Sequence, residues 1–216
     1  MQSQIRLVVF DLGRVLVKIC DNWQHAAQVA KLPAPLPKFD ENTRDSLRAH
    51  VFANERGELT QLDFCHRAAE LLGIEPKHVE AMSDIYLLGV FPGVGRLLDD
   101  LIEAGLDIAC LSNTNDNHWR IMFGDDENYA ELNRLQHRFG SHLIAMRKPD
   151  PKIFKHVEEQ TGFTSQQILF FDDMLDNIES ARRCGWGAEQ ILPDSDPVAQ
   201  MRKHLIHHRV LQESQS

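Results

Sequence analysis

The feature that most constrains the fold is an alternation of short apolar runs with helical patterns. Between the apolar runs, apolar residues recur every three or four positions, as they do in amphipathic helices. Such alternation predicts an α/β fold, in which a parallel sheet carries helices on both faces. The expected strands are Ile5–Phe10, Leu106–Leu111, Leu143–Ala145, Ile168–Phe171 and Gln190–Leu192.

Three of these expected strands are followed by side chains that can do chemistry. Asp11 follows the first strand, Ser112 and Asn113 follow the second, and Asp172 and Asp173 follow the fourth. In open parallel sheets, ligands bind beyond the carboxyl ends of the strands. The sequence therefore predicts a single site that gathers these residues at one edge of the sheet.

The segment between Ile19 and Gly89 has a different pattern, with no convincing strand. A usual crossover between parallel strands is far shorter, so we expect a small helical cap domain inserted after the first strand. Ordinary crossover helices are the alternative. On this division, residues 1–18 and 90–216 form the core and residues 19–89 form the cap. The helices expected in the cap are Trp23–Leu32, Asn42–Asn54, Leu62–Leu72 and Pro76–Leu88.

Composition excludes several classes of partner. The formal net charge of −9 argues against a nucleic-acid-binding face, which needs clustered Lys and Arg. The apolar runs are too short to span a membrane, and the N-terminus has no signal-peptide pattern. Four widely spaced cysteines indicate free thiols in a reducing compartment, rather than a zinc site or disulfides. We expect a cytoplasmic protein; the sequence does not indicate its oligomeric state.

Asp11 is well placed to act as a nucleophile. It follows the apolar run Leu7–Phe10 and precedes a turn that contains Leu12 and Gly13. A strand-end carboxylate can attack an electrophile, and backbone N–H groups of the turn can bind the oxygens of the transferred group. An Asp-x-Gly sequence also occurs in turns with no catalytic role, so this motif alone leaves both interpretations open.

The pair Asp172-Asp173 indicates a divalent cation. Two adjacent carboxylates at the end of a buried strand repel each other and are costly to desolvate. Magnesium resolves this conflict, because it prefers a few carboxylates together with water and phosphate oxygens. The alternative is that both side chains turn to solvent.

Lys148 and Ser112 are candidates for binding a phosphoryl group. The ammonium of Lys148 can neutralise both an attacking carboxylate and a phosphate, although a surface lysine before a helix fits its position as well. The hydroxyl of Ser112, at a strand end, can donate to a phosphoryl oxygen or serve a turn.

Four segments follow one another along the chain: Phe10-Asp11-Leu12-Gly13, Leu111-Ser112-Asn113-Thr114, Arg147-Lys148-Pro149 and Phe171-Asp172-Asp173. In this order they are far more specific than any one of them. Together they resemble the four motifs of the haloacid dehalogenase superfamily, over the chain as far as about Leu192. Their residues are similar to those of subfamily IA, in particular bacterial α-D-glucose-1-phosphate phosphatases and the phosphatase domain of soluble epoxide hydrolases. The resemblance implies a three-layer Rossmann-like core with strand order 5-4-1-2-3 and an inserted helical cap.

The resemblance also implies a role for each of these residues. Asp11 is the nucleophile and a magnesium ligand, the carbonyl of Gly13 and the carboxylate of Asp173 are further ligands, and Asp172 supports the ion through water. Ser112 and Lys148 are implied to act in catalysis by holding the phosphoryl group. The residues implied to contact substrate are Leu12, Gly13, Ser112, Asn113 and Lys148.

The chain departs from the superfamily pattern at Gly13. Most phosphatases of the superfamily carry an aspartate there, two residues after the nucleophile, as general acid and base. Loss of a positioned acid costs about 10²–10⁴ in rate. This favours leaving groups that need little protonation, such as anomeric or acyl phosphates. His118 could lend a proton if it reaches the pocket, or it could lie on a helix surface.

The sequence thus predicts a magnesium-dependent phosphatase that hydrolyses a small phosphorylated metabolite, such as a sugar 1-phosphate, through an aspartyl-phosphate. One alternative is a non-catalytic binding or regulatory protein that lost turnover with the acid. Another is a haloacid dehalogenase, which needs no metal and would leave the Asp172-Asp173 pair unexplained. Candidate specificity residues in the cap, whose direction the sequence does not give, are Trp23, Arg44, His50, Phe52 and Arg56.

Overall fold

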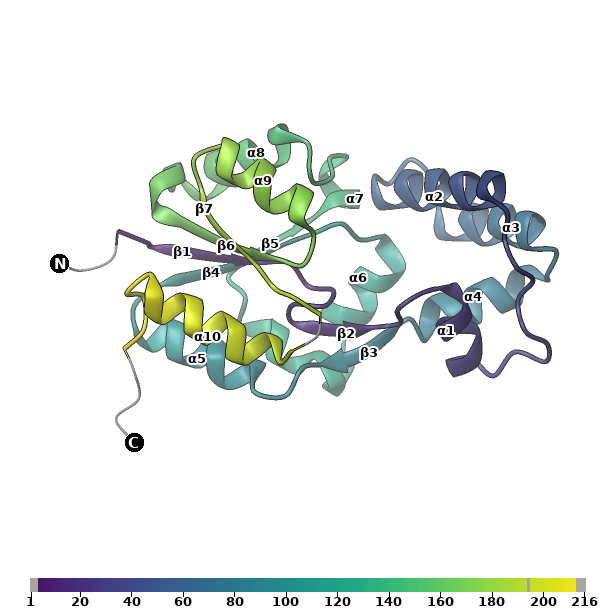
Figure 1. The fold of residues 1–216 in the computed structure, drawn as a ribbon, viewed down its shortest axis with the longest axis horizontal. Coiled ribbons are helices and arrows are strands. Elements are labelled where there is room, and N and C mark those ends of the chain that lie inside the picture. Colours follow the sequence, from purple (N-terminus) through teal and green to yellow (C-terminus); the bar gives the residue numbers. More distant parts are fainter. Residues whose placement is uncertain (1–3, 194, 213–216) are drawn as a thin grey trace.

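A computed structural model describes residues 4–193 and 195–212, and a five-stranded parallel sheet lies at its centre (Figure 1). The sheet order is β5-β4-β1-β6-β7, with β1 paired in parallel to both β4 and β6. Counted along the chain, the five strands read 3-2-1-4-5, which is the expected order 5-4-1-2-3 from the other edge, so the α/β prediction is confirmed. The strands are β1 Leu7–Phe10, β4 Asp107–Ser112, β5 His137–Gly140, β6 Ile168–Asp172 and β7 Gly187–Gln190.

Helices cover both faces of this sheet (Figure 1). Val8 and Phe10 of β1 pack into one apolar cluster, with residues of α5 and α10. Leu7 and Val9 point to the other face and pack with residues of α8 and α9. A strand buried on both faces needs a continuous apolar run, which is why β1 and β6 stand out in the sequence. These helices are α5 Val94–Glu103, α8 Pro151–Thr161, α9 Leu175–Arg183 and α10 Pro197–His207.

Four helices form a separate cluster beyond the carboxyl ends of the strands (Figure 1). We refer to them as the cap; their apolar residues pack with one another in a cluster distinct from the two beside the sheet. Thr60 caps the third helix by accepting from the backbone N–H of Asp63 at 3.1 Å. The division into a core of 1–18 and 90–216 and a cap of 19–89 stays a prediction. The four helices are α1 Trp23–Val29, α2 Glu41–Glu55, α3 Gln61–Leu72 and α4 Pro76–Asp84.

The segment expected to lack strands contains one. β3, Leu87–Val90, pairs in antiparallel fashion with β2, Val17–Ile19, where the chain passes between the core and the cap (Figure 1). Gly89 within β3 has no side chain to pack and weakens the strand pattern. The remaining short elements are α6 Asp116–Phe123, η1 Glu127–Arg134, α7 Ser141–Ile144 and η2 Ser165–Gln167.

Both edge strands of the main sheet were placed wrongly by the sequence pattern. Leu143–Ala145 is not a strand: Leu143 lies in helix α7 and is 60% exposed, while the strand is His137–Gly140. Gln190–Leu192 starts where β7 ends. An edge strand has one neighbour and partial cover, so it does not need the continuous apolar run that marks a central strand.

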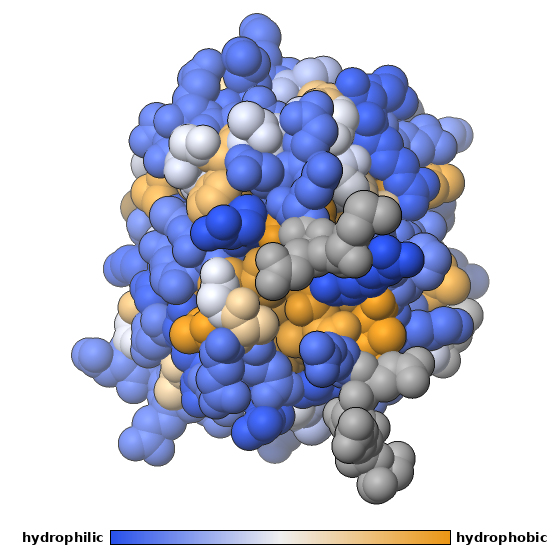
Figure 2. All heavy atoms as spheres, turned by 90° about the vertical axis from the view of Figure 1, so that its left-hand side faces the viewer, coloured by the Kyte–Doolittle hydropathy of each residue, from blue (hydrophilic) through white to orange (hydrophobic). Residues whose placement is uncertain are grey.

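The end of the molecule away from the cap is covered mainly by hydrophilic residues, around a smaller apolar area (Figure 2). Within residues 4–193 and 195–212, no helix combines the length and the apolar character needed to cross a bilayer.

Candidate active site

A cavity of about 660 Å³ lies between the carboxyl ends of the strands and the cap. Most of the residues singled out in the sequence line it, so the structure brings them together as expected. Leu12 does not: its side chain is buried in the core, and only its backbone belongs to the turn. Asp172 is fully buried just behind the cavity wall. The motif residues in the lining are Asp11, Gly13, Ser112, Asn113, Lys148 and Asp173.

Lys148 is the centre of the charge arrangement. Its side chain is 1% exposed, which rules out the surface lysine considered above. Its Nζ lies 2.6 Å from Asp172 Oδ2 and 3.0 Å from Asp11 Oδ1. Burial alone would lower the pKa of Lys148, but the two carboxylates outweigh burial and raise it. Lys148 therefore stays charged at the bottom of the cavity.

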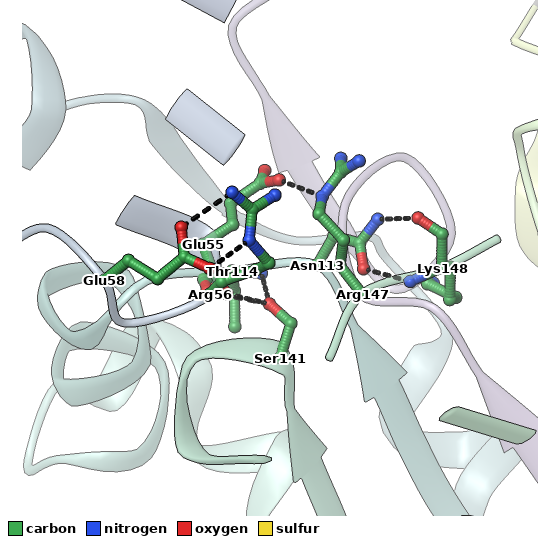
Figure 3. Close-up of polar contacts among 8 residues, drawn as sticks. All are labelled: Glu55, Arg56, Glu58, Asn113, Thr114, Ser141, Arg147 and Lys148. Atoms are coloured by element: carbon green, nitrogen blue, oxygen red, sulfur yellow. Dashed lines mark hydrogen bonds and ion pairs between the residues drawn. The ribbon is translucent and has the colours of Figure 1, made fainter. Parts of the chain in front are cut away.

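Asn113 positions this lysine through its backbone. The side-chain oxygen of Asn113 accepts from the Lys148 backbone N–H at 2.8 Å, and its Nδ2 donates to the Lys148 carbonyl at 2.9 Å (Figure 3). Both ends of the amide are thereby engaged. The family resemblance implied that Asn113 contacts substrate. In the structure, its side chain instead fixes the segment that carries Lys148.

Asp172 has three hydrogen-bond donors around it. Besides Lys148, its Oδ1 accepts from the backbone N–H of Met174 at 2.8 Å and from Nδ2 of Asn177 at 2.9 Å. A carboxylate held in this way orients its neighbours and has little freedom to bind a ligand directly. Asn177 thereby holds the Asp172 carboxylate in place. The sequence offers Asp176 as a possible N-cap of the helix that ends near Gly185, but Asp176 lies in the first turn of α9, whose N-cap is Met174.

Asp11 carries a carboxylate in an unusual electrostatic position. Its side chain is 13% exposed, and its Oδ1 has no hydrogen-bond partner, although Lys148 lies at ion-pair distance. Burial raises the pKa of Asp11 to about 7; Lys148 lowers it, and repulsion from Asp172 and Asp173 adds to the rise. The site therefore has more negative charge than its own cations balance.

Arg14 is a site residue that the sequence analysis missed. It follows Gly13 in the turn after β1 and has φ 61°, which is uncommon for a residue with a side chain. Its guanidinium lies 3.6 Å from Asp173 and also donates to the carbonyl of Asp21. Asp173 remains close to other carboxylates, and burial together with Asp172 raises its pKa. The strained turn therefore directs a cation at the outer carboxylate of the cluster.

The three carboxylates fit a divalent metal ion. Asp11, Asp172 and Asp173 each offer an oxygen, and these oxygens lie within 4.8 Å of one another. The unpartnered oxygen of Asp11 and the surplus negative charge are both satisfied by a hard cation with oxygen ligands. Asp11 and Asp173 face the cavity and could hold the ion, while the engaged Asp172 supports them from behind.

Cap and core meet directly at this site (Figure 3). Glu55, at the end of α2, accepts from Nε of Arg147 at 2.9 Å, and the Arg147 guanidinium lies 3.7 Å from the ring centre of Phe52. Ser141 Oγ donates to the backbone carbonyls of Glu55 and Thr114. The motif that carries Lys148 thus also binds the cap, a contact that the sequence analysis did not predict.

Two of the five cap residues named as specificity candidates face the cavity. Trp23 and Phe52 line it, whereas Arg44 lies beside a smaller pocket on the cap and Arg56 pairs with the exposed Glu58. His50 is absent from the lining of both cavities in the described chain. The charged cap candidates therefore point elsewhere, and the aromatic ones face the site.

His118 lies in the cavity wall and is half-buried, so it is not a histidine on the free surface of a helix. Its Nε2 lies 3.0 Å from the carbonyl of Ser83, and its ring stacks on Tyr86 with centres 5.4 Å apart. Burial lowers the pKa of His118 to about 4, although the bond to Ser83 opposes this. At neutral pH the ring is uncharged, and its Nε2–H donates to the Ser83 carbonyl instead of facing a leaving group.

This histidine should make the fold sensitive to mild acid. Since the pKa of His118 is lower in the folded chain, the unfolded chain takes up the proton first as the pH falls below about 6.5. The stability of the folded chain is unaffected by protonation of His118 above that pH, and it falls progressively between about pH 6.5 and pH 4. Between pH 7 and pH 5, urea unfolding should show the wild type losing about 2 kcal/mol more stability than His118→Gln. Parallel pH curves for the two proteins would contradict the assignment.

Comparison with known proteins places this arrangement among related chains. A model of haloacid dehalogenase-like hydrolases matches residues 5–185. The drimenol cyclase drtB of Aspergillus calidoustus is 26% identical over 187 residues, which cover 84% of this chain and 33% of that protein. The enolase-phosphatase E1 of Yersinia pestis is 26% identical over 110 residues, covering 50% of this chain and 47% of the enzyme. The chain thus spans a third to a half of these relatives.

A solved structure matches more completely. A mutant of the HAD family enzyme bt-2542 from Bacteroides thetaiotaomicron, in complex with magnesium and inorganic phosphate, aligns with a TM-score of 0.71 and 25% identity. The alignment covers 89% of this chain and 96% of that one. The likeness extends over the cap as well as the sheet, since it includes nearly all of both chains.

Proposed function

Because the chain belongs to the haloacid dehalogenase-like hydrolase family, we propose that it is a magnesium-dependent phosphatase of a small phosphorylated metabolite. The observation that carries the proposal is the arrangement at the bottom of the cavity. Asp11 lies beside a buried, charged Lys148, within a group of carboxylates that fits a divalent cation. Bound magnesium and phosphate in the bt-2542 structure support the same chemistry here.

The reaction we propose has two steps at Asp11. A carboxylate oxygen of Asp11 attacks phosphorus, the bond from phosphorus to the leaving oxygen breaks, and an aspartyl-phosphate results. Water then attacks phosphorus, which releases phosphate and restores the carboxylate. Lys148 and the Ser112 hydroxyl hold the phosphoryl oxygens, while Asp172 keeps Lys148 in place. When bound, magnesium supplies charge stabilisation and orientation for the phosphoryl group.

Turnover of an aryl phosphate tests this proposal against its alternatives. We expect p-nitrophenyl phosphate to be hydrolysed with magnesium and not after treatment with EDTA. A non-catalytic binding protein would release no phosphate in either condition. A haloacid dehalogenase would release halide from 2-haloacids without metal, which would leave the carboxylates around Lys148 unexplained. We favour the phosphatase because of those carboxylates.

Gly13 is expected to restrict the leaving group. No side chain at this position can protonate the departing oxygen, and the uncharged His118 does not replace it. A primary alkoxide is a strong base and needs a proton, whereas an anomeric oxygen is less basic. We therefore expect a higher kcat/KM for glucose 1-phosphate than for glucose 6-phosphate, and equal values would refute the leaving-group argument.

Gly13→Asp should relieve this restriction. A Cβ at Gly13 would lie 3.3 Å from Cδ1 of Ile19, the mobile end of a flexible side chain, so a small shift makes room. We expect kcat for primary phosphates such as glucose 6-phosphate to rise about 10²-fold, with a smaller gain for aryl phosphates. Gly13→Asn, of the same size but without an acid, is the matched control. A similar gain in both variants would contradict the role of the acid.

A further inference from the structure

The cap side of the cavity is strongly apolar. On α4 and just beyond it, Val79, Met82 and Tyr86 recur at helical spacing and so share one face. The other cap helices add three aromatic rings, those of Trp23, Phe52 and Phe64, and the ring centres of Trp23 and Phe64 are 6.3 Å apart. We call this surface the cap wall; its apolar members are Trp23, Ala26, Val51, Phe52, Phe64, Val79, Met82 and Tyr86.

Most polar side chains in the cap portion of the lining have at least one partner within the chain. Asn54 Nδ2 donates to the carbonyl of Leu59, and Ser83 Oγ accepts from Gln61 Nε2. The oxygen of Asn22 accepts from a backbone N–H as the cap of α1. Glu55 is paired with Arg147. Hydroxyl groups of a bound sugar would thus lose water and meet few free partners on this side.

The cavity is also much larger than a phosphate group needs. Its volume of about 660 Å³ is within the range of pockets that enclose a drug-sized ligand, roughly 300–1,000 Å³. The charged group around Lys148 lies at the strand ends, where the phosphoryl group is expected, and Glu55 and Arg147 are paired with each other. On the cap side, the space beyond is bounded by the cap wall, so the organic part of the substrate has apolar surface to lie against.

We propose that this cavity selects phosphomonoesters whose organic part is apolar, an alkyl or aryl group, over sugar and polyol phosphates. The inference rests on the proposed phosphatase function and adds the class of substrate. A sugar 1-phosphate has the weakly basic leaving oxygen that Gly13 favours, but its polar body does not suit the cap wall. An aryl phosphate meets both requirements, because a phenolic oxygen is a weak base and the ring is apolar.

A homologous series of substrates tests the proposal with the wild-type protein and magnesium. In ethyl, butyl and hexyl phosphate the leaving group remains a primary alcohol, so the missing acid at Gly13 slows all three alike and their ratio reports the apolar body alone. We expect kcat/KM to rise about fourfold for each added methylene until the cavity is filled. The kcat/KM for hexyl phosphate should exceed that for a hexitol phosphate of equal length by at least about 100-fold. Equal values for this pair would overturn the proposal.

Acetyl phosphate separates failure of this inference from failure of the phosphatase assignment. It has a good leaving group and almost no organic body, so it reports phosphoryl transfer alone. If acetyl phosphate and the alkyl series all stay intact, the phosphatase function fails. If acetyl phosphate is hydrolysed and chain length has no effect, the apolar selection fails. Binding of alkylphosphonates to Asp11→Asn, measured by calorimetry, should show the same dependence on chain length without turnover.

Variants of the cap wall locate the effect. Met82→Gln places a polar group of similar size in the wall, and Met82→Leu is the matched apolar control. We expect the ratio of kcat/KM for hexyl phosphate to that for acetyl phosphate to fall about tenfold in the Gln variant and to be retained in the Leu variant. Val51→Thr, at a half-buried position, repeats the test if Met82→Gln does not fold. Unchanged ratios in Met82→Gln or Val51→Thr would overturn the proposal.

Discussion

Asp11→Asn is expected to lower kcat by at least about 10⁴-fold in a protein that remains folded. An amide is a poor nucleophile, and it cannot form the aspartyl-phosphate. The substitution preserves shape in a mostly buried position, so substrate should still enter the cavity. The measurement is phosphate release under single-turnover conditions with saturating magnesium.

The charge arrangement predicts that this variant is not destabilised. Asp11 adds a third negative charge beside Asp172 and Asp173, and removing it relieves repulsion. Lys148 keeps its 2.6 Å contact with Asp172, so the buried cation is not left unpaired. We expect the Tm to stay the same or to rise by a few degrees.

A neighbouring carboxylate provides the control. Asp176 is exposed at the rim of the same cavity, so Asp176→Asn makes the same chemical change outside the charged group. Asp176→Asn should keep kcat within about threefold of the wild type. If Asp11→Asn retained more than about 1% of wild-type kcat, the nucleophile would have to be another group.

Burial explains which parts of the fold could be predicted. The central strands β1, β4 and β6 are buried on both faces, and each contains a continuous apolar run that predicts a strand. The edge strands do not: β5 has the sequence His-Arg-Phe-Gly, in which partial cover permits polar residues. Because the site lies at the ends of the central strands, its main residues could be identified from the sequence although two strands were misplaced.

Long-range pairing explains what the sequence could not supply. Glu55 and Arg147 are 92 positions apart, and their contact depends on how the cap lies over the core. Arg14 points at Asp173 only because the turn after Gly13 adopts a left-handed backbone. The burial of Lys148 likewise follows from packing, since an isolated lysine before a proline gives no sign of its depth.

Substitutions of the adjacent carboxylates Asp172 and Asp173 should have opposite signatures, although the two residues have the same chemistry. Asp173→Ala removes a carboxylate that faces the cavity, so the magnesium concentration needed for half-maximal activity should rise more than about 100-fold. Its stability without metal should change little, since Asp173 is close to two other carboxylates and its nearest cation lies at 3.6 Å.

Asp172→Ala should instead act mainly on the fold. Asp172 is 0% exposed, and its loss leaves the Met174 N–H and the Asn177 amide without their acceptor. The buried Lys148 ammonium loses its 2.6 Å partner and keeps Asp11 at 3.0 Å. Removing one partner of a buried ion pair costs about 3–5 kcal/mol. Urea unfolding without magnesium should reveal this loss, whereas the shift in magnesium requirement should be about 10-fold to 100-fold, smaller than for Asp173→Ala.

Asp172→Asn separates the charge of Asp172 from its hydrogen bonds. The amide oxygen can still accept from the Met174 N–H, but the charge that pairs with Lys148 is gone. We therefore expect Asp172→Asn to lie between the wild type and Asp172→Ala in unfolding free energy. The supporting role would be wrong if Asp172→Ala unfolded at the wild-type urea midpoint. If neither Asp172→Ala nor Asp173→Ala changed the magnesium dependence, the metal site would be misplaced. The surplus carboxylates around Lys148 would then bind another cation or none.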